Sequence, residues 1–150
     1  MRLSKPVTAS FVVSGLIVGA SLAVLAADAY QDRHMAMEEI NDAMKPLAAI
    51  AKKQAPFDAA VVKASATTIA DNLKKASTFF PAGSGGGESL AKPEVWTDAA
   101  GFEKTMKDAQ AAAVALQSVA DEAGFRPALG ALGGNCKACH DKYRLPPKQQ

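Results

Sequence analysis

Apolar residues recur at steps of three and four along most of the 150-residue chain, which is the spacing of one face of an α-helix. These stripes predict four helices, at about residues 32–53, 58–80, 93–120 and 126–144. No segment alternates apolar and polar residues as a half-buried strand would. The pattern therefore predicts an all-α fold, a four-helix up-and-down bundle with short connections.

The breaks between the stripes carry the residues that are common at helix ends. Pro46 lies inside the first stripe and is predicted to kink that helix or to start a new turn. Asp58 is a good N-cap for the second helix, and Gly124 is predicted to end the third. Residues 82–90 are rich in glycine but lack the Gly-Lys-Ser/Thr ending of a phosphate-binding loop, so we interpret them as a flexible linker.

The N-terminal segment has the organisation of a secretory signal. Arg2 and Lys5 form a positive start, and the run from Phe11 to Ala27 is uncharged and rich in aliphatic residues. That run is interrupted by serine and glycine and is shorter than the roughly 20 residues of a usual membrane-spanning helix. An Ala-x-Ala site predicts cleavage after Ala29, with a second candidate at Ala26.

Loss of residues 1–29 would leave residues 30–150, a length that suits one domain with one hydrophobic core. The formal net charge of the whole chain is only +2, so a nucleic-acid role has no electrostatic support. Contact with a membrane is expected only through the export signal. Together with the motif described next, export predicts a location in the bacterial periplasm.

The main chemical signal is Cys136-Lys137-Ala138-Cys139-His140, which contains the only two cysteines of the chain. Cys-x-x-Cys-His is the pattern for covalent attachment of a c-type haem. Residues three and four apart share one face of a helix, so Cys136, Cys139 and His140 can all meet one flat macrocycle. The two thiols would form thioethers with the haem vinyl groups, and His140 would be the proximal iron ligand. The predicted cofactor is one covalent haem c per chain.

A redox disulfide and a zinc site both suit the two cysteines less well than haem does. A disulfide of the thioredoxin kind calls for a βαβ setting, which the helical pattern does not supply. A zinc site needs four ligands, and beyond the three residues of the motif only His34 remains as a strong nitrogen or sulfur donor. A haem-free disulfide or metal-binding bundle is therefore the weakest alternative.

The position of the motif, at the C-terminal end of the last of four helices, resembles the class II cytochromes c, the cytochrome c-prime family. The resemblance extends to Pro56-Phe57-Asp58 and to Lys92-Pro93-Glu94-Val95-Trp96, and it covers nearly all of residues 30–150. It implies two functional forms, which differ in a distal residue on the first helix. A methionine that ligates the iron gives a low-spin electron carrier. A bulky residue that does not ligate leaves the sixth position open to NO or CO.

The resemblance also implies roles for individual residues. Met37 matches the distal position, so His140 and Met37 would be the two axial ligands, while Arg33 would approach a haem propionate. Arg144 would lie beside the proximal histidine and the haem edge. Two alternatives stay open: methionine is often only a filler of hydrophobic cores, and His34 shares nearly the same helix face as Met37 and could be the sixth ligand instead.

The segments 45–51 and 79–82 are more similar to the low-spin subgroup. The sequence therefore predicts a periplasmic electron-transfer protein with His/Met axial ligation, and it predicts no enzymatic activity and no catalytic residues. Periplasmic redox proteins are the expected partners, and a homodimer is a further expectation. The alternative is a five-coordinate, high-spin cytochrome c-prime that binds small gases.

Overall fold

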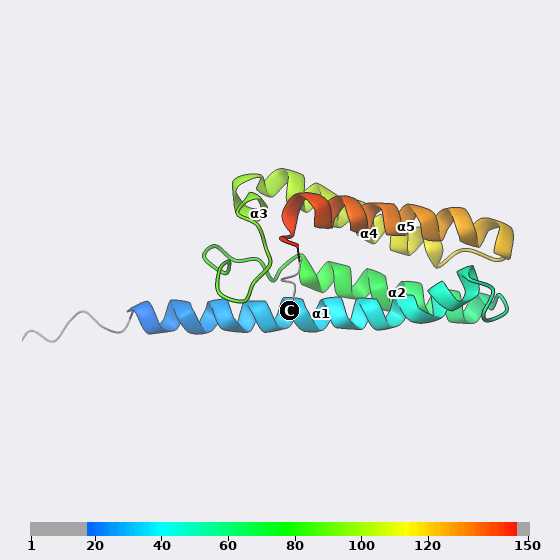
Figure 1. Ribbon diagram of the computed structural model, residues 1–150, viewed down its shortest axis with the longest axis horizontal. Helices are drawn as coiled ribbons and strands as arrows, with labels where there is room; N and C mark the ends of the chain where they lie inside the picture. Colours follow the sequence, from blue (N-terminus) through cyan, green and yellow to red (C-terminus); the bar gives the residue numbers. More distant parts are fainter. Residues whose placement is uncertain (1–17, 147–150) are drawn as a thin grey trace, which may run out of the picture.

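The structure is a computed structural model that describes the backbone of residues 18–146, with side chains from Asp28 onward. Within this range the chain forms helices and a single isolated β-bridge, with no strand. The helices are α1 (Val18–Ala51), α2 (Ala59–Ala76), α3 (Glu94–Thr97), α4 (Ala99–Leu116) and α5 (Glu122–Tyr143). Four of them run lengthwise and the one-turn α3 lies at one end (Figure 1). The predicted all-α four-helix bundle is confirmed.

Helix α1 is longer than the apolar stripe predicts. It begins at Val18 instead of near residue 32, and it passes the predicted cleavage site at Ala29 without a break. The cleavage itself stays a prediction, since residues 1–17 lie outside the described part. The helix also continues through Pro46, because Leu47 and Ile50 beyond the proline are buried in the core and hold that last turn in place. In the described residues no helix combines the length and the hydropathy that a membrane span requires.

The N-cap of α2 is confirmed, whereas the predicted third helix is divided. The Asp58 carboxylate accepts hydrogen bonds from the first turn of α2. Asp98 leaves the helical conformation (φ −121°, ψ 51°), so that α3 ends before it and α4 begins after it. Gly124, predicted to end a helix, lies in the first turn of α5, because the side chain of Asp121 accepts from its N–H at 2.8 Å and caps that helix.

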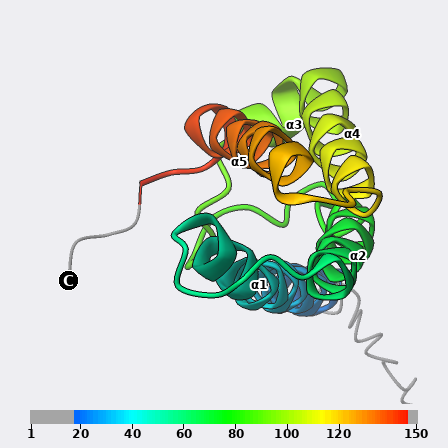
Figure 2. The same cartoon turned by 90° about the vertical axis from the view of Figure 1, so that its right-hand side faces the viewer.

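The helices pack in sequence around the core: α1 against α2, α2 against α4, and α4 against α5. Their buried stripes meet in one cluster, whose largest fully buried side chains are Phe125, Leu47, Ile69, Leu116, Leu132 and Val62. The fourth side of the bundle differs, because α1 and α5 make at most marginal contact there. Figure 2, which looks along the bundle, shows these two helices facing each other across that side.

The end of α5 is tied to the segment that joins α2 to α3. The N–H of Lys92 donates to the carbonyl of Tyr143 at 2.9 Å, and the N–H of Leu145 donates to the carbonyl of Leu90 at 2.7 Å. The isolated bridge pairs Ala91 with Arg144 at the same place. These bonds fix the C-terminal turn of α5, which carries the Cys-x-x-Cys-His motif.

Candidate haem site

Cys136, Cys139 and His140 lie in the last two turns of α5, where the spacing of three and four residues puts them on one side of the helix. Both cysteines are free thiols, are half-buried and pack against the hydrophobic core. Burial raises the pKa of Cys136, and burial with the neighbouring Cys136 raises the pKa of Cys139 to about 11. Both side chains are therefore neutral thiols at pH 7, held side by side.

The His140 imidazole reaches the protein surface, yet the surrounding atoms of the bundle desolvate it and lower its pKa. The positive charge of Arg144 lowers this pKa further, and Asp141 acts in the opposite direction. A neutral imidazole is the form that ligates iron. The Arg144 side chain is exposed, and its backbone N–H donates to the His140 carbonyl at 3.1 Å, which closes the last turn of α5.

Helix α1 faces the motif from across the side of the bundle where α1 and α5 make at most marginal contact. The C-terminal part of α5 lies alongside the middle of α1 (Figure 1). In that stretch of α1, Ala36 and Ile40 are buried, and Met37 is half-buried and packs against the same core cluster. His34 differs: its side chain is exposed, lies 3.3 Å from the Glu38 carboxylate and stacks on Tyr30. His34 thus contacts Glu38 and Tyr30, whereas Met37 packs against apolar side chains of the core.

A covalent haem fits these residues. Two neutral thiols and an imidazole lie on one side of α5, and the side of the bundle between α5 and α1 is the one that the helices leave unpaired. The described residues contain no group of three or more His, Cys, Asp or Glu side chains that could hold a metal ion by themselves.

Arg33 is buried, with 7% of its surface exposed, and its guanidinium is directed at the segment after α2. Its Nη1 donates to the carbonyl of Phe79 at 2.6 Å and to the hydroxyl of Ser84 at 3.0 Å. Its Nη2 donates to the carbonyl of Ser84 at 2.8 Å and to the hydroxyl of Ser89 at 3.2 Å. The predicted propionate contact of Arg33 stays a prediction, and the two serines are partners that sequence reasoning missed.

A second cluster that the sequence did not reveal joins the end of α5 to the start of α4. The Asp98 carboxylate accepts from Tyr143 at 2.8 Å and from Lys142 at 2.6 Å, and these two bonds lower its pKa. Gly101 is required next to it, since a Cβ there would lie 2.7 Å from the Tyr143 hydroxyl. The Tyr143 ring also stacks edge-to-face on Phe102. Asp98 thus fixes the orientation of α5 just beyond His140.

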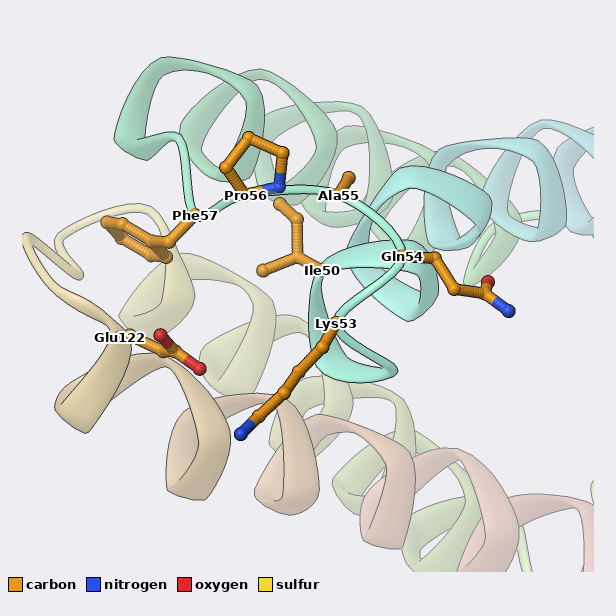
Figure 3. Close-up of a pocket in the computed structure, with 7 residues that line it drawn as sticks. All are labelled: Ile50, Lys53, Gln54, Ala55, Pro56, Phe57 and Glu122. Carbon is orange, nitrogen blue, oxygen red and sulfur yellow. The ribbon is translucent and has the colours of Figure 1, made fainter.

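A cavity lies away from this site, at the opposite end of α1 and α5. It measures about 390 Å³ and is lined by Ile50, Lys53, Gln54, Ala55, Pro56, Phe57 and Glu122 (Figure 3). Its lining contains no cysteine, histidine or methionine, and Glu122 and Lys53 are its charged side chains. The cavity is therefore separate from the haem motif.

A helical bundle that carries Cys-x-x-Cys-His on its last helix defines a c-type cytochrome of class II. A sequence profile of the family described as cytochrome C' matches residues 28–144. The cytochrome c' of Rhodopseudomonas palustris is 41% identical over 135 residues, which cover 88% of this chain and 92% of that protein. The cytochrome c-556 of Agrobacterium fabrum is 41% identical over 145 residues, with 94% and 95% covered.

Solved structures agree with these relatives. A structure of cytochrome c' from Rhodopseudomonas palustris superposes with a TM-score of 0.76 at 40% identity, covering 81% of this chain and 98% of that one. The nitric oxide complex of a leucine-to-alanine variant of cytochrome c prime from Alcaligenes xylosoxidans gives 0.74 at 34% identity, covering 81% and 96%. The chain therefore belongs to the cytochrome c' family, whose members carry a covalent c-type haem with iron.

Proposed function

We propose that this chain is an exported, periplasmic haem protein whose iron is five-coordinate and binds small neutral gases such as NO or CO. The observation that carries the proposal is the apolar character of α1 opposite the haem motif, where Ala36, Met37 and Ile40 are the buried or half-buried side chains. Apolar distal side chains suit a neutral diatomic ligand more than the activation of a polar substrate, and the buried Arg33 one turn away has its guanidinium hydrogen-bonded to Phe79 and Ser84. The relationship to proteins named cytochrome c', one of them solved as a nitric oxide complex, supports the same assignment.

A second candidate function is electron transfer by a six-coordinate iron with His140 and Met37 as axial ligands. The specific observation in its favour is the thioether of Met37, the sulfur ligand that raises the reduction potential of c-type haems. Relatives named cytochrome c-556 are as similar to this chain as those named cytochrome c'. The partners would then be other periplasmic redox proteins.

Under either candidate the residues of the chain have distinct tasks. Cys136 and Cys139 would hold the macrocycle covalently, and His140 would ligate the iron from α5. The Asp98 cluster and the backbone bonds of residues 90–92 hold the end of α5, so that the imidazole keeps one orientation. Haem, when bound, supplies an iron atom that changes oxidation state and accepts a further ligand. The side chain at Met37 then decides whether that further ligand comes from the protein or from solution.

Optical spectra of the purified haem protein, ferric and ferrous, test the proposal. We expect high-spin bands in both oxidation states and binding of CO to the ferrous form without displacement of a protein ligand. A low-spin ferric spectrum with a weak sulfur-to-iron charge-transfer band would reject the five-coordinate proposal in favour of the second candidate. A preparation exported from a haem-c-competent bacterium that lacks haem absorption would reject both.

A further inference from the structure

Arg33 has an unusual environment for a buried cation. No carboxylate lies within ion-pair distance of it in the described part of the chain. A buried charge without a counter-ion is costly unless its donors are satisfied. Four hydrogen bonds satisfy the terminal nitrogens here, and the Phe80 ring lies 4.9 Å from the guanidinium carbon in a cation–π contact. Every one of these partners belongs to residues 79–89.

In the segment 79–89, which we call the glycine loop, Gly85 lies against the Trp96 ring, and two backbone hydrogen bonds, from Ser84 to Pro81 and from Ser89 to Gly86, are local. Gly83, Gly86 and Gly87 have positive φ angles, and a Cβ added to any of them would have no neighbouring atom within 4 Å. Ser84 and Ser89 are nevertheless buried, at 3% and 8% exposure. Two small polar residues in an otherwise exposed loop are buried because both hydroxyls accept hydrogen bonds from Arg33.

The ends of the glycine loop are anchored separately. The indole N–H of Trp96 lies within hydrogen-bond distance of the carbonyls of Phe80 and Pro81, at 3.1 and 3.0 Å. Leu90 is held by the N–H of Leu145 just after the loop. Between these two points Arg33 supplies the long-range hydrogen bonds of the loop.

Arg33 lies one helical turn before Met37, so both side chains leave the same face of α1. We propose that Arg33 is a positioning residue: by fixing the glycine loop against α1 it narrows the approach to the distal face beside Met37. The access of gases to the haem would thus depend on a loop that never contacts iron. This inference adds a means of control to the proposed function and rests on it only for the gas-binding measurement.

Two variants of the haem protein test the inference. Arg33→Gln removes the positive charge and the guanidinium N–H groups that make the four hydrogen bonds. The double variant Ser84→Ala with Ser89→Ala leaves the arginine in place and removes only two acceptors, so it remains informative if the first variant folds poorly. Arg33→Lys keeps the charge and offers a partial rescue. Arg126→Gln is the matched control, because Arg126 is exposed and pairs with Glu122 on the surface of α5.

The first measurement is amide hydrogen exchange over residues 80–90 at neutral pH, which reports on the loop whatever the coordination of the iron. We expect much faster exchange in Arg33→Gln, smaller increases in the double serine variant and in Arg33→Lys, and no change in Arg126→Gln. Unchanged exchange in both Arg33→Gln and the double serine variant would overturn the inference.

The second measurement is the rate of CO association to the ferrous protein, made in a Met37→Ala background so that the sixth position is open in every sample. A several-fold faster association in the variants with a loosened loop supports the inference. Faster exchange with an unchanged association rate overturns the claim that the loop narrows the approach. A low-spin spectrum of the parent protein would reject the five-coordinate proposal, while the exchange comparison would still test whether Arg33 fixes the loop.

Discussion

Replacement of Met37 by alanine separates the two candidate functions. The Met37 side chain is half-buried, so its truncation should cost about half of the 2–5 kcal/mol typical of a fully buried methionine, or about 1–2.5 kcal/mol. Alanine has the highest helix propensity, and α1 is held on both sides of this position by buried residues such as Ala36 and Ile40. The variant should therefore fold and keep its haem.

The spectrum and the CO kinetics of this variant carry the result. If the iron is five-coordinate, Met37→Ala stays high-spin and binds CO faster, because the side chain over the distal face is shorter. If Met37 ligates iron, the variant changes from low-spin to high-spin and its reduction potential falls. Met44→Ala is the control, since Met44 is also half-buried against the core and lies two turns further along α1. It should lose comparable stability in denaturant unfolding and keep the parent spectrum.

One outcome would refute the reasoning for both candidates. If Met37→Ala leaves a low-spin spectrum intact and CO binding unchanged, Met37 is not the distal residue. The exposed His34 would then be the next ligand to test, although its contacts with Glu38 and Tyr30 would have to break first.

Three further predictions concern the attachment of haem, a helix end and an ion pair. The double variant Cys136→Ala with Cys139→Ala should release haem into acidified organic solvent, whereas the native protein retains it; free extraction from the native protein would contradict covalent attachment. Lys53, two residues after the end of α1, has a φ of 59°, so Lys53→Gly should stabilise the fold by about 0.5–1 kcal/mol in denaturant unfolding, and a loss of stability would contradict strain at this residue. Hydrogen bonds from the Lys142 ammonium and from a tyrosine hydroxyl lower the pKa of Asp98, so its stabilising effect is present above the ordinary aspartate pKa of about 3.9 and is lost as the pH falls through the lower folded-state value. Between about pH 5 and 2 the free energy of unfolding should therefore fall more steeply in the parent protein than in Asp98→Asn, because only the parent protonates this carboxylate on unfolding. Parallel curves for the two proteins would contradict the assignment.

Local patterns in the sequence were sufficient for the all-helical fold class and for grouping the residues of the Cys-x-x-Cys-His motif. The stripes of apolar residues predicted the four-helix bundle, because each long helix buries one face against its neighbours. Asp58 could be recognised as an N-cap, since its hydrogen bonds reach only two and three residues ahead. Cys136, Cys139 and His140 could be grouped for the same reason: three- and four-residue spacings within one helix set their geometry without help from the rest of the chain.

The remaining features depend on partners that are distant in the chain. Asp98 divides the predicted third helix and binds Tyr143, 45 residues later, which no pattern around Asp98 indicates. Arg33 is a second case: its guanidinium binds Phe79, Ser84 and Ser89, 46 to 56 residues away, and no pattern around Arg33 indicates these partners. Amino-acid sequence alone determined the helical class of the fold and the thiol-imidazole motif, because both follow from the periodicity of one helix. Tertiary structure alone decided where the glycine loop lies and what holds α5, because those depend on hydrogen bonds formed only after the helices have packed.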